Sequence, residues 1–305
     1  MSSTSPAVEV VGLCKSFGPH IVLDGLDLRA ETGQVAGFLG PNGSGRSTTF
    51  RILLGMLRAE ATTMRVLGGD PWNDAVALHR RIAYVPGEVS LWPNLTGGQA
   101  IDIIGRLRGG VDKRRRDELL QLFDLDPTKK ARAYSQGNRQ KVALVSALAS
   151  DAELLVLDEP TLGFDPLMEA AFRDCIREAK ARGRTVLLSS NSFAEVEILC
   201  DTVTIIRRGR TVESGRLDGL PRLHHTAVSV ILDDPTALAS MPGVNDLVID
   251  GQRATLTVAD ADMGAILAGL ALLRPRGIVA TRPTLEELFL RHYRTEPAAD
   301  REVLP

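Results

Sequence analysis

The sequence has few cysteines and no long hydrophobic run. Its three cysteines, among 305 residues, are widely spaced and form no C-x-x-C pair, which excludes a disulfide framework and a zinc site of the usual spacing. The longest apolar run, MGAILAGLALL at 263–273, is far shorter than the roughly 20 residues that a membrane-spanning helix needs. The first ten residues, MSSTSPAVEV, lack the apolar core of a signal peptide. These absences favour a globular protein of a reducing compartment.

An excess of charge of one sign is also missing. Lysine and arginine total 36 and aspartate and glutamate 38, so the net charge of -2 does not favour a nucleic-acid partner. Only six of the 36 basic residues are lysine. This bias is typical of a G+C-rich genome, and it weakens any argument that one particular arginine was selected for function.

The segment GPNGSGRST, residues 40–48, matches the phosphate-binding pattern G-x-x-x-x-G-K-[ST] except at one position. It follows QVAGFLG at 34–40, which is typical of a strand, and it precedes the helical pattern STTFRILLGML at 47–57. A strand, a glycine loop and a helix in this order are the context that a phosphate-binding loop requires. The alternative is a glycine-rich turn without a ligand.

The glycines of this segment have a physical role in such a site. Gly40, Gly43 and Gly45 allow a tight turn that aims backbone N–H groups at phosphate oxygens, at the positive end of the following helix. By position in the pattern, Ser47 is expected to bind magnesium and Thr48 to lie near the inner phosphates.

A second pattern, ELLVLDEPT at 153–161, complements the first. Its four apolar residues at 154–157 predict a buried strand with Asp158 and Glu159 at the carboxyl end, where ligands bind in parallel α/β sheets. We expect Asp158 to hold magnesium through water and Glu159 to act as the general base. Taken alone, such a run indicates only a buried strand that ends at the surface. Together with the glycine loop, it indicates a nucleotide site.

Between the two patterns lies YSQGNRQKVALVSALAS, residues 134–150. Ser135 and Gly137 precede a helical pattern and are therefore expected at a helix N-terminus, which can bind an anion. In isolation the segment indicates only a capped helix.

These motifs, in this order, resemble the ATP-binding subunit of an ABC transporter, in the drug-exporter (ABC-2 type) branch whose permease is a separate chain. Four further segments support the resemblance. KSFG at 15–18 is similar to the loop whose aromatic residue stacks on adenine, and YVPGEVSLWPNLTG at 84–97 is similar to the segment that senses the γ-phosphate and contacts the permease. LGFDPL at 162–167 is similar to the loop that couples the two sites of a dimer, and SSNSFAEVE at 189–197 stands in the place of the switch loop.

The resemblance implies an α/β fold, a P-loop NTPase cassette with a RecA-like core, an antiparallel β subdomain and a helical subdomain at about 89–150. We expect this ATP-binding domain to span 1–218. Residues 219–305 have a different pattern, with strand-like runs around an Asp250-Gly251 hairpin turn and an apolar helix at 263–273, and predict a small α+β accessory domain. The segment TRPTLEELFLRHYR at 281–294 resembles the closing segment of the same branch.

The cofactors implied by the resemblance are ATP and Mg2+. The residues expected to contact ATP are Phe17, Gly40, Pro41, Asn42, Gly43, Ser44, Gly45, Arg46, Ser47, Thr48, Ser135, Gln136, Gly137 and Asp165. The expected magnesium ligands are Ser47, Asp158 and Glu88, and the expected catalytic residues are Glu159 and Asn191.

Three positions depart from the family pattern. Arg46 replaces the lysine of the loop and keeps its charge on a bulkier planar group. Asn191 replaces a histidine, and an amide cannot become cationic or move a proton. Loss of one preorganised donor typically costs roughly 3 to 4 kcal/mol of transition-state stabilisation, so slow hydrolysis is expected. Glu88, after Gly87, stands where many relatives have glutamine, and we interpret it as a trait of the branch.

The implied partners are an integral membrane permease, which exports a hydrophobic or amphiphilic compound, and a second cassette; no nucleic acid is expected. The second cassette completes a homodimer or a heterodimer, and both remain open. The implied location is the cytoplasmic face of the cell membrane. The alternative function is a non-hydrolysing regulatory or heterodimer-partner cassette, and Glu159 argues against it because a pure binding module needs no general base.

The helical subdomain is expected to contain helices at 98–110 and 117–125. The basic run KRRR at 113–116 lies between them, and we interpret it as a solvated helix face.

Overall fold

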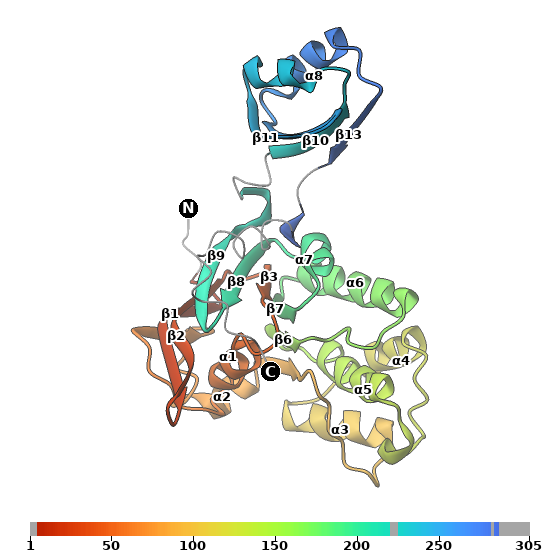
Figure 1. The fold of residues 1–305 in the computed structure, drawn as a ribbon. Coiled ribbons are helices and arrows are strands. Elements are labelled where there is room, and N and C mark those ends of the chain that lie inside the picture. Colours follow the sequence, from red (N-terminus) through yellow and green to blue (C-terminus); the bar gives the residue numbers. More distant parts are fainter. Residues whose placement is uncertain (1–4, 220–224, 282–283, 287–305) are drawn as a thin grey trace. The chain divides into compact units, whose positions relative to one another are not determined.

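The chain folds into two compact units, Met1–Arg216 and Leu217–Pro305 (Figure 1). This is a computed structural model, and it describes residues 5–219, 225–281 and 284–286. No helix within these ranges is long and apolar enough to cross a membrane.

The first unit is built on a six-stranded sheet with the order β5-β6-β7-β3-β8-β9. All neighbours are parallel except β8 and β9. The strands are β3 (Val35–Leu39), β5 (Ile82–Val85), β6 (Leu154–Asp158), β7 (Thr185–Ser190), β8 (Thr202–Arg207) and β9 (Arg210–Arg216). The five parallel strands β5, β6, β7, β3 and β8 therefore have their carboxyl ends at one edge of the sheet.

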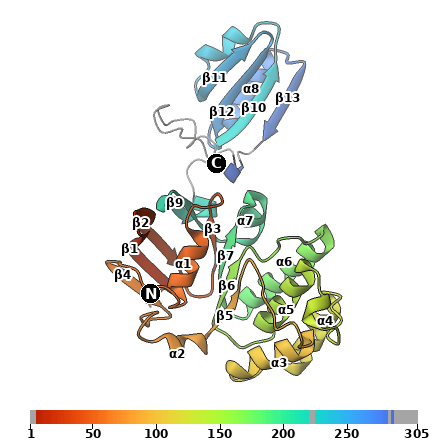
Figure 2. The same cartoon turned by 60° about the horizontal axis from the view of Figure 1, so that its bottom comes forward.

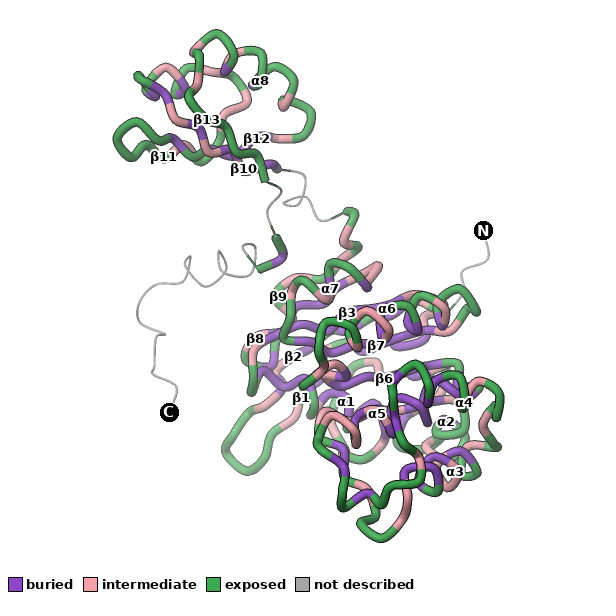
Figure 3. Tube along the Cα trace, turned by 90° about the vertical axis from the view of Figure 1, so that its right-hand side faces the viewer, coloured by how far each residue is buried: buried purple, intermediate pink, exposed green. Residues whose placement is uncertain are grey.

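Both faces of this sheet are buried. Along β6, Leu155 and Leu157 belong to one hydrophobic core, whereas Leu154 and Val156 belong to the other. Successive residues of a strand point to opposite faces, so a continuous apolar run fills both cores. Figure 3 shows the buried positions of the central strands in purple.

A helical layer covers one face of the sheet, and an antiparallel sheet with α1 covers the other (Figure 2). The antiparallel sheet has the order β2-β1-β4, formed by β1 (Val8–Phe17), β2 (His20–Ala30) and β4 (Thr63–Val66). The helices of the first unit are α1 (Arg46–Leu53), α2 (Ala75–His79), α3 (Gly97–Leu107), α4 (Lys113–Leu122), α5 (Gln136–Leu148), α6 (Pro166–Ala181) and α7 (Phe193–Leu199), with a 3-10 turn at Ala131–Ala133.

Helix α1 ends earlier than the sequence pattern predicts. It stops at Leu53 and not at 57, because Gly55 adopts a left-handed conformation with φ 66°. A Cβ at Gly55 would lie 2.2 Å from the Pro71 carbonyl oxygen, so this close approach requires glycine.

The basic run at the start of α4 is only partly a solvated face. The Arg114 side chain is 89% exposed, but those of Arg115 and Arg116 are 15% and 20% exposed. Arg115 forms an ion pair with Glu178 of α6, and Arg116 pairs with Asp102 of α3 at 3.3 Å. The solvated interpretation was wrong for these two residues, which join α4 to its neighbours.

The second unit is a four-stranded antiparallel sheet with one helix. Its order is β11-β12-β10-β13. Its elements are a 3-10 turn at Leu217–Gly219, β10 (His225–Ile231), a 3-10 helix at Pro235–Ser240, β11 (Val244–Asp250), β12 (Arg253–Ala259), α8 (Met263–Leu272) and β13 (Gly277–Thr281). Gly251, with φ 57°, forms the turn between β11 and β12. Most of the closing segment 281–294 lies outside the described residues.

The fold class predicted from the sequence is confirmed. The parallel core, the antiparallel sheet and the helical layer make up the first unit, and the appended unit is α+β.

Candidate functional site

Four sequence motifs meet at the carboxyl edge of the central sheet. The loop 40–48 follows β3, residues 86–88 follow β5, Glu159 follows β6 and Asn191 follows β7. Because β5, β6, β7 and β3 are successive parallel neighbours, these segments lie side by side at one edge. The sequence patterns predict each segment separately, and the strand order brings them together.

The loop has the geometry of a phosphate cradle. Gly43 and Gly45 have φ values of 78° and 111°, which favour glycine. A Cβ at Gly40 would lie 2.4 Å from the Ile206 carbonyl oxygen, so that position also requires glycine. Helix α1 begins at Arg46, within the segment 40–48, and the free N–H groups of its first turn are available to an anion.

Arg46 does not extend into solvent. Its side chain is 6% exposed, and its Nη2 lies 2.5 Å from Glu159 Oε1 and 3.3 Å from Asn42 Oδ1. The residue at the lysine position therefore forms an ion pair with the residue expected to be the general base.

The backbone of Glu159 is held in an unusual conformation. Its φ is 46°, which is uncommon for a residue other than glycine. Its N–H donates to the carbonyl oxygen of Ser189 at 3.2 Å and to Ser189 Oγ at 3.1 Å. These bonds fix the direction in which the Glu159 side chain leaves the sheet.

Ser189, near the end of β7, also orients the expected magnesium ligand. Its hydroxyl donates to Asp158 Oδ1 at 2.5 Å, and Asp158 is 5% exposed. Burial, followed by the charge of Asp158, raises the pKa of Tyr84 to about 12, so this phenol stays neutral beside the site. A Cβ at Gly87 would lie 3.3 Å from the Asp158 carbonyl oxygen, which places the segment before Glu88 against Asp158.

A second carboxyl group lies behind the switch position. Glu195 of α7 accepts from Ser190 Oγ at 2.6 Å and from Thr161 Oγ1 at 2.9 Å. Burial raises its pKa above the ordinary value, although both hydrogen bonds oppose the shift. The sequence patterns did not indicate Ser189, Ser190, Thr161 or Glu195 individually. Ser189, Ser190 and Glu195 lie within the segment 189–197, and Thr161 ends the pattern 153–161, and these locations were the available signal.

Gln140 provides a further link that the sequence did not reveal. This residue of α5 is 2% exposed, and its Nε2 donates to the Pro86 carbonyl oxygen at 3.2 Å. It connects α5, the helix of the segment 134–150, to the segment after β5.

Among the remaining predicted site residues, Gly137 is half-buried and the others are exposed, and their described contacts are local. Phe17 is 48% exposed, with Lys15 Nζ 5.0 Å from its ring centroid. Ser135 caps α5 by accepting from the Asn138 N–H, and Asp165 caps α6. Gln136 and Gly137 lie in the first turn of α5.

Two buried polar atoms support an anionic ligand at the loop. Within the described parts of the chain, Ser44 Oγ and Arg46 Nη1 have no hydrogen-bond partner. Buried polar groups are normally paired, so these two atoms fit a phosphate as the missing partner. Described residues contain no cluster of three or more His, Cys, Asp or Glu that could hold a metal ion. The donor set present, the Ser47 hydroxyl with the Asp158 and Glu88 carboxylates, suits a Mg2+ that keeps water and phosphate ligands.

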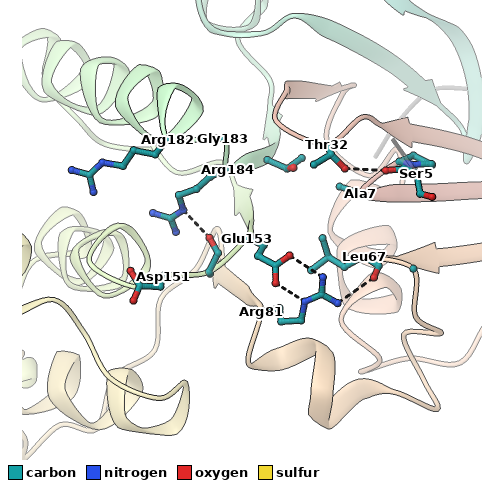
Figure 4. Close-up of a pocket in the computed structure, with 14 residues that line it drawn as sticks. Ser5, Ala7, Thr32, Leu67, Arg81, Asp151, Glu153, Arg182, Gly183 and Arg184 are labelled. Carbon is teal, nitrogen blue, oxygen red and sulfur yellow. Dashed lines mark hydrogen bonds and ion pairs between the residues drawn. The ribbon is translucent and has the colours of Figure 1, made fainter. Parts of the chain in front are cut away.

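A cavity of about 520 Å³ lies at the opposite, amino edge of the sheet. Figure 4 shows Arg81 there between Glu153 and the Leu67 carbonyl, with bonds of 2.6 and 2.8 Å to the carboxylate. Arg184 donates to the carbonyl oxygens of Ala152, Leu148 and Ala147. Because the guanidinium groups of Arg81 and Arg184 are paired with atoms of the chain itself, neither of these two arginines is left for a ligand.

Comparison with known proteins identifies similar sequences. Residues 23–162 match a protein family described as "ABC transporter". The daunorubicin resistance ATP-binding protein DrrA3 of Streptomyces coeruleorubidus is 36% identical over 300 residues, which covers 93% of this chain and 95% of the relative. The Nod factor export ATP-binding protein I of Rhizobium sp. (strain N33) is 31% identical over 295 residues, covering 93% and 96%.

Solved structures with a similar fold are also ATP-binding cassettes. The ATP-binding subunit of an ABC transporter superimposes with a TM-score of 0.64 and 28% identity, over 70% of this chain and 90% of that chain. A dimeric cassette bound to ADP and Pi has a TM-score of 0.62 and 20% identity, over 70% and 100%, and it shows the fold alone.

Proposed function

The chain belongs to the ABC transporter family, and from this premise we propose that it binds Mg-ATP, hydrolyses it slowly and drives a separate permease. It is the ATP-binding subunit of an ABC exporter of the drug-resistance and Nod-factor-export type. The single observation that carries the slow turnover is the 2.5 Å ion pair between Arg46 and Glu159.

The phosphate-binding residues come from the loop and from α1. Backbone N–H groups of 45–48 would donate to phosphate oxygens, together with Ser44 Oγ and Arg46 Nη1, which lack partners among the described residues. Ser47, Asp158 and Glu88 would hold Mg2+, and Ser189 orients the Asp158 carboxylate by donating to it. The bound metal would neutralise phosphate charge during transfer.

Hydrolysis requires a free base and a group that stabilises the transition state. Glu159 is the expected base, but one of its oxygens already accepts a charge-assisted bond from Arg46. Asn191 at the end of β7 can donate from its amide, but it cannot carry a proton. Both features support a slow rate.

An apolar cavity of about 440 Å³ supports docking of a permease. It is lined by Leu54, Met56, Val76, His79, Arg80, Ile82, Tyr84, Ile104, Leu107 and Arg108. Met56, Val76 and Leu107 are 55%, 77% and 77% exposed, which is unusual for large apolar side chains on one concave surface. The cavity adjoins the start of the segment 84–97, so we propose that a cytoplasmic element of the permease inserts here. The chain would then act at the cytoplasmic face of the cell membrane.

The names of two relatives support a class of exported compound. One is named for daunorubicin resistance and another for Nod factor export. A hydrophobic or amphiphilic compound is therefore proposed, with its selection made by the permease.

The test measures ATP binding by calorimetry and turnover by phosphate release, for the purified chain and the Arg46→Lys/Asn191→His double variant. The native chain should bind ATP and turn it over slowly, and the double variant should be faster by on the order of 100-fold or more. Absence of ATP binding would refute the nucleotide site, and equal turnover would refute impairment.

The second candidate is a cassette that binds ATP without hydrolysing it, as a regulator or as the weaker half of a heterodimer. The same Arg46–Glu159 pair favours it, because the pair occupies the base. ATP binding with no phosphate release above that of buffer would support this function over the first.

A further inference from the structure

Arg46 can hold two partners at once, and a lysine in the same place could not do so in the same geometry. Its guanidinium is a planar fork with separated N–H arms, whereas lysine carries a compact ammonium. The Nη2 arm binds Glu159 and Asn42. The Nη1 arm is buried and has no partner in the described part of the chain.

We propose that Arg46 is a latch that bridges the general base to the bound phosphate. The Nη2 arm keeps the Glu159 carboxylate, and the Nη1 arm binds a phosphate oxygen. This inference rests on the proposed ATP site and deepens it. It predicts that nucleotide binds while the base stays occupied, so the ATP-bound state is long-lived.

The backbone of Glu159 is held in place, so it cannot move the carboxylate away from Arg46. Glu159 is fixed at φ 46° by two bonds from its N–H to Ser189, and Ser189 is itself 0% exposed. Release would therefore require rotation of the Glu159 side chain against a charge-assisted bond of 2.5 Å. Oε1 of Glu159 is already occupied by the bond from Arg46, so the carboxylate must break this bond before it can turn toward the attacking water.

The latch can be tested with a double-mutant cycle on the full-length chain. The four proteins are the native chain, Arg46→Lys, Glu159→Gln and the combination, and phosphate release is measured for each. We expect Glu159→Gln to lower turnover by less than about 3-fold in the native chain, and by about 100-fold or more in the Arg46→Lys background. A drop of about 100-fold in the native chain would overturn the latch, whether or not Arg46→Lys folds.

ATP affinity is a second measurement, and it would not change in this way if Arg46 had only a structural role. Loss of the Glu159 charge frees the Nη2 arm for phosphate, so Glu159→Gln should tighten ATP binding by about 5-fold more in the native chain than in the Arg46→Lys background. Equal gains in the two backgrounds would overturn the latch but leave ATP binding intact. No ATP binding by any of the four proteins would overturn the proposed function itself.

Arg51→Lys is the matched control. Arg51 lies on the same helix, α1, and is exposed. This exchange should leave both turnover and ATP affinity unchanged, and an effect equal to that of Arg46→Lys would overturn the latch.

Discussion

The two edges of the central sheet both hold an arginine bound to a glutamate, yet they differ in what is left unpaired. At the amino edge, Arg81 binds Glu153 in a bidentate manner, and its remaining nitrogen donates to the Leu67 carbonyl. At the carboxyl edge, Arg46 binds Glu159 with one arm and leaves the other buried without a partner in the described chain.

Cavity size alone does not show which edge of the sheet binds a ligand. The amino edge has a cavity of about 520 Å³, but Arg81 and Arg184 are paired within the chain. The carboxyl edge combines a glycine loop with two buried polar atoms that lack partners among the described residues. Gln34 Oε1 and Thr202 Oγ1, just before β3 and at the start of β8, are also buried without a partner among the described residues. An unpaired polar atom therefore indicates a ligand site only where, as at the carboxyl edge, it lies in a glycine loop at a helix N-terminus.

The largest expected effect at the amino edge is that of Arg184→Ala. Burial lowers the pKa of Arg184 to about 10, and its guanidinium binds three carbonyl oxygens around the end of α5. The substitution should lower the free energy of unfolding by about 2 to 4 kcal/mol and leave ATP affinity unchanged. Both tryptophans, Trp72 and Trp92, lie in the first unit, so urea unfolding followed by their fluorescence reports on this unit.

Arg182→Ala provides the control for this prediction. Arg182 is 56% exposed and pairs with Glu178 on the surface of α6. Its loss should change stability by no more than about 0.5 kcal/mol. If Arg184→Ala weakened ATP binding at equal stability, the assignment of the amino edge to structure would be wrong.

At the carboxyl edge, we expect the substitution of an unpaired polar group to lower the affinity for ATP and to leave the free energy of unfolding unchanged. Ser44 is 3% exposed and its hydroxyl has no partner in the described structure, so Ser44→Ala removes no side-chain bond from the folded chain. It should weaken ATP binding by about 5-fold to 10-fold, or about 1 to 1.5 kcal/mol, without lowering stability. Calorimetry and urea unfolding measure the two quantities.

Ser150→Ala is the matched exchange at the other edge. Ser150 is similarly buried, but its hydroxyl donates to the Ala147 carbonyl at 2.7 Å. This variant should lose stability and keep ATP affinity. The comparison fails if both serine variants affect the same quantity.

Sequence patterns predicted the parts of the carboxyl edge that are local. The glycine loop at 40–48 and the strand ending in Asp158 are each formed by residues that are neighbours in the sequence. The order and spacing of such residues predict the local backbone conformation directly. The pairing of Arg46 with Glu159 is not local, because 113 positions separate the two residues. Their contact depends on a strand order in which only β7 lies between β3 and β6, and the sequence alone does not specify that order.

The same reason explains the missed residues. Ser189 is one of several small polar residues near strand ends, and only the pairing of β6 with β7 brings its hydroxyl to Asp158. Arg115 belongs to a basic run that is typical of a solvated helix face, and it is largely buried because α4 contacts α6. Long-range packing of this kind leaves little trace in a single sequence.

Two glutamates, one near each edge of the sheet, should make the free energy of unfolding depend on pH in opposite directions. Glu195, behind the carboxyl edge, has its pKa raised by burial above its ordinary value of 4.5. Between 4.5 and the raised pKa, the folded state keeps a proton that the unfolded state has lost, so stability falls as pH rises through this window. Glu195→Gln should remove this part of the pH dependence in urea unfolding between acidic and neutral pH. Equal slopes for the two proteins would contradict it.

The smallest expected effect is that of Glu153→Gln, and its pH dependence has the opposite sign. The hydrogen bond from Arg81 lowers the pKa of Glu153 below 4.5, so its stabilisation is present above 4.5 and is lost as pH falls through the folded pKa. The two side chains are 42% and 54% exposed, so solvent screens the pair and the variant should lose less than about 1 kcal/mol at neutral pH. The loss should shrink in high salt and vanish below the folded pKa, with ATP affinity unchanged. A loss that persists at acidic pH would mean that Glu153 stabilises the amino edge through packing and not through charge.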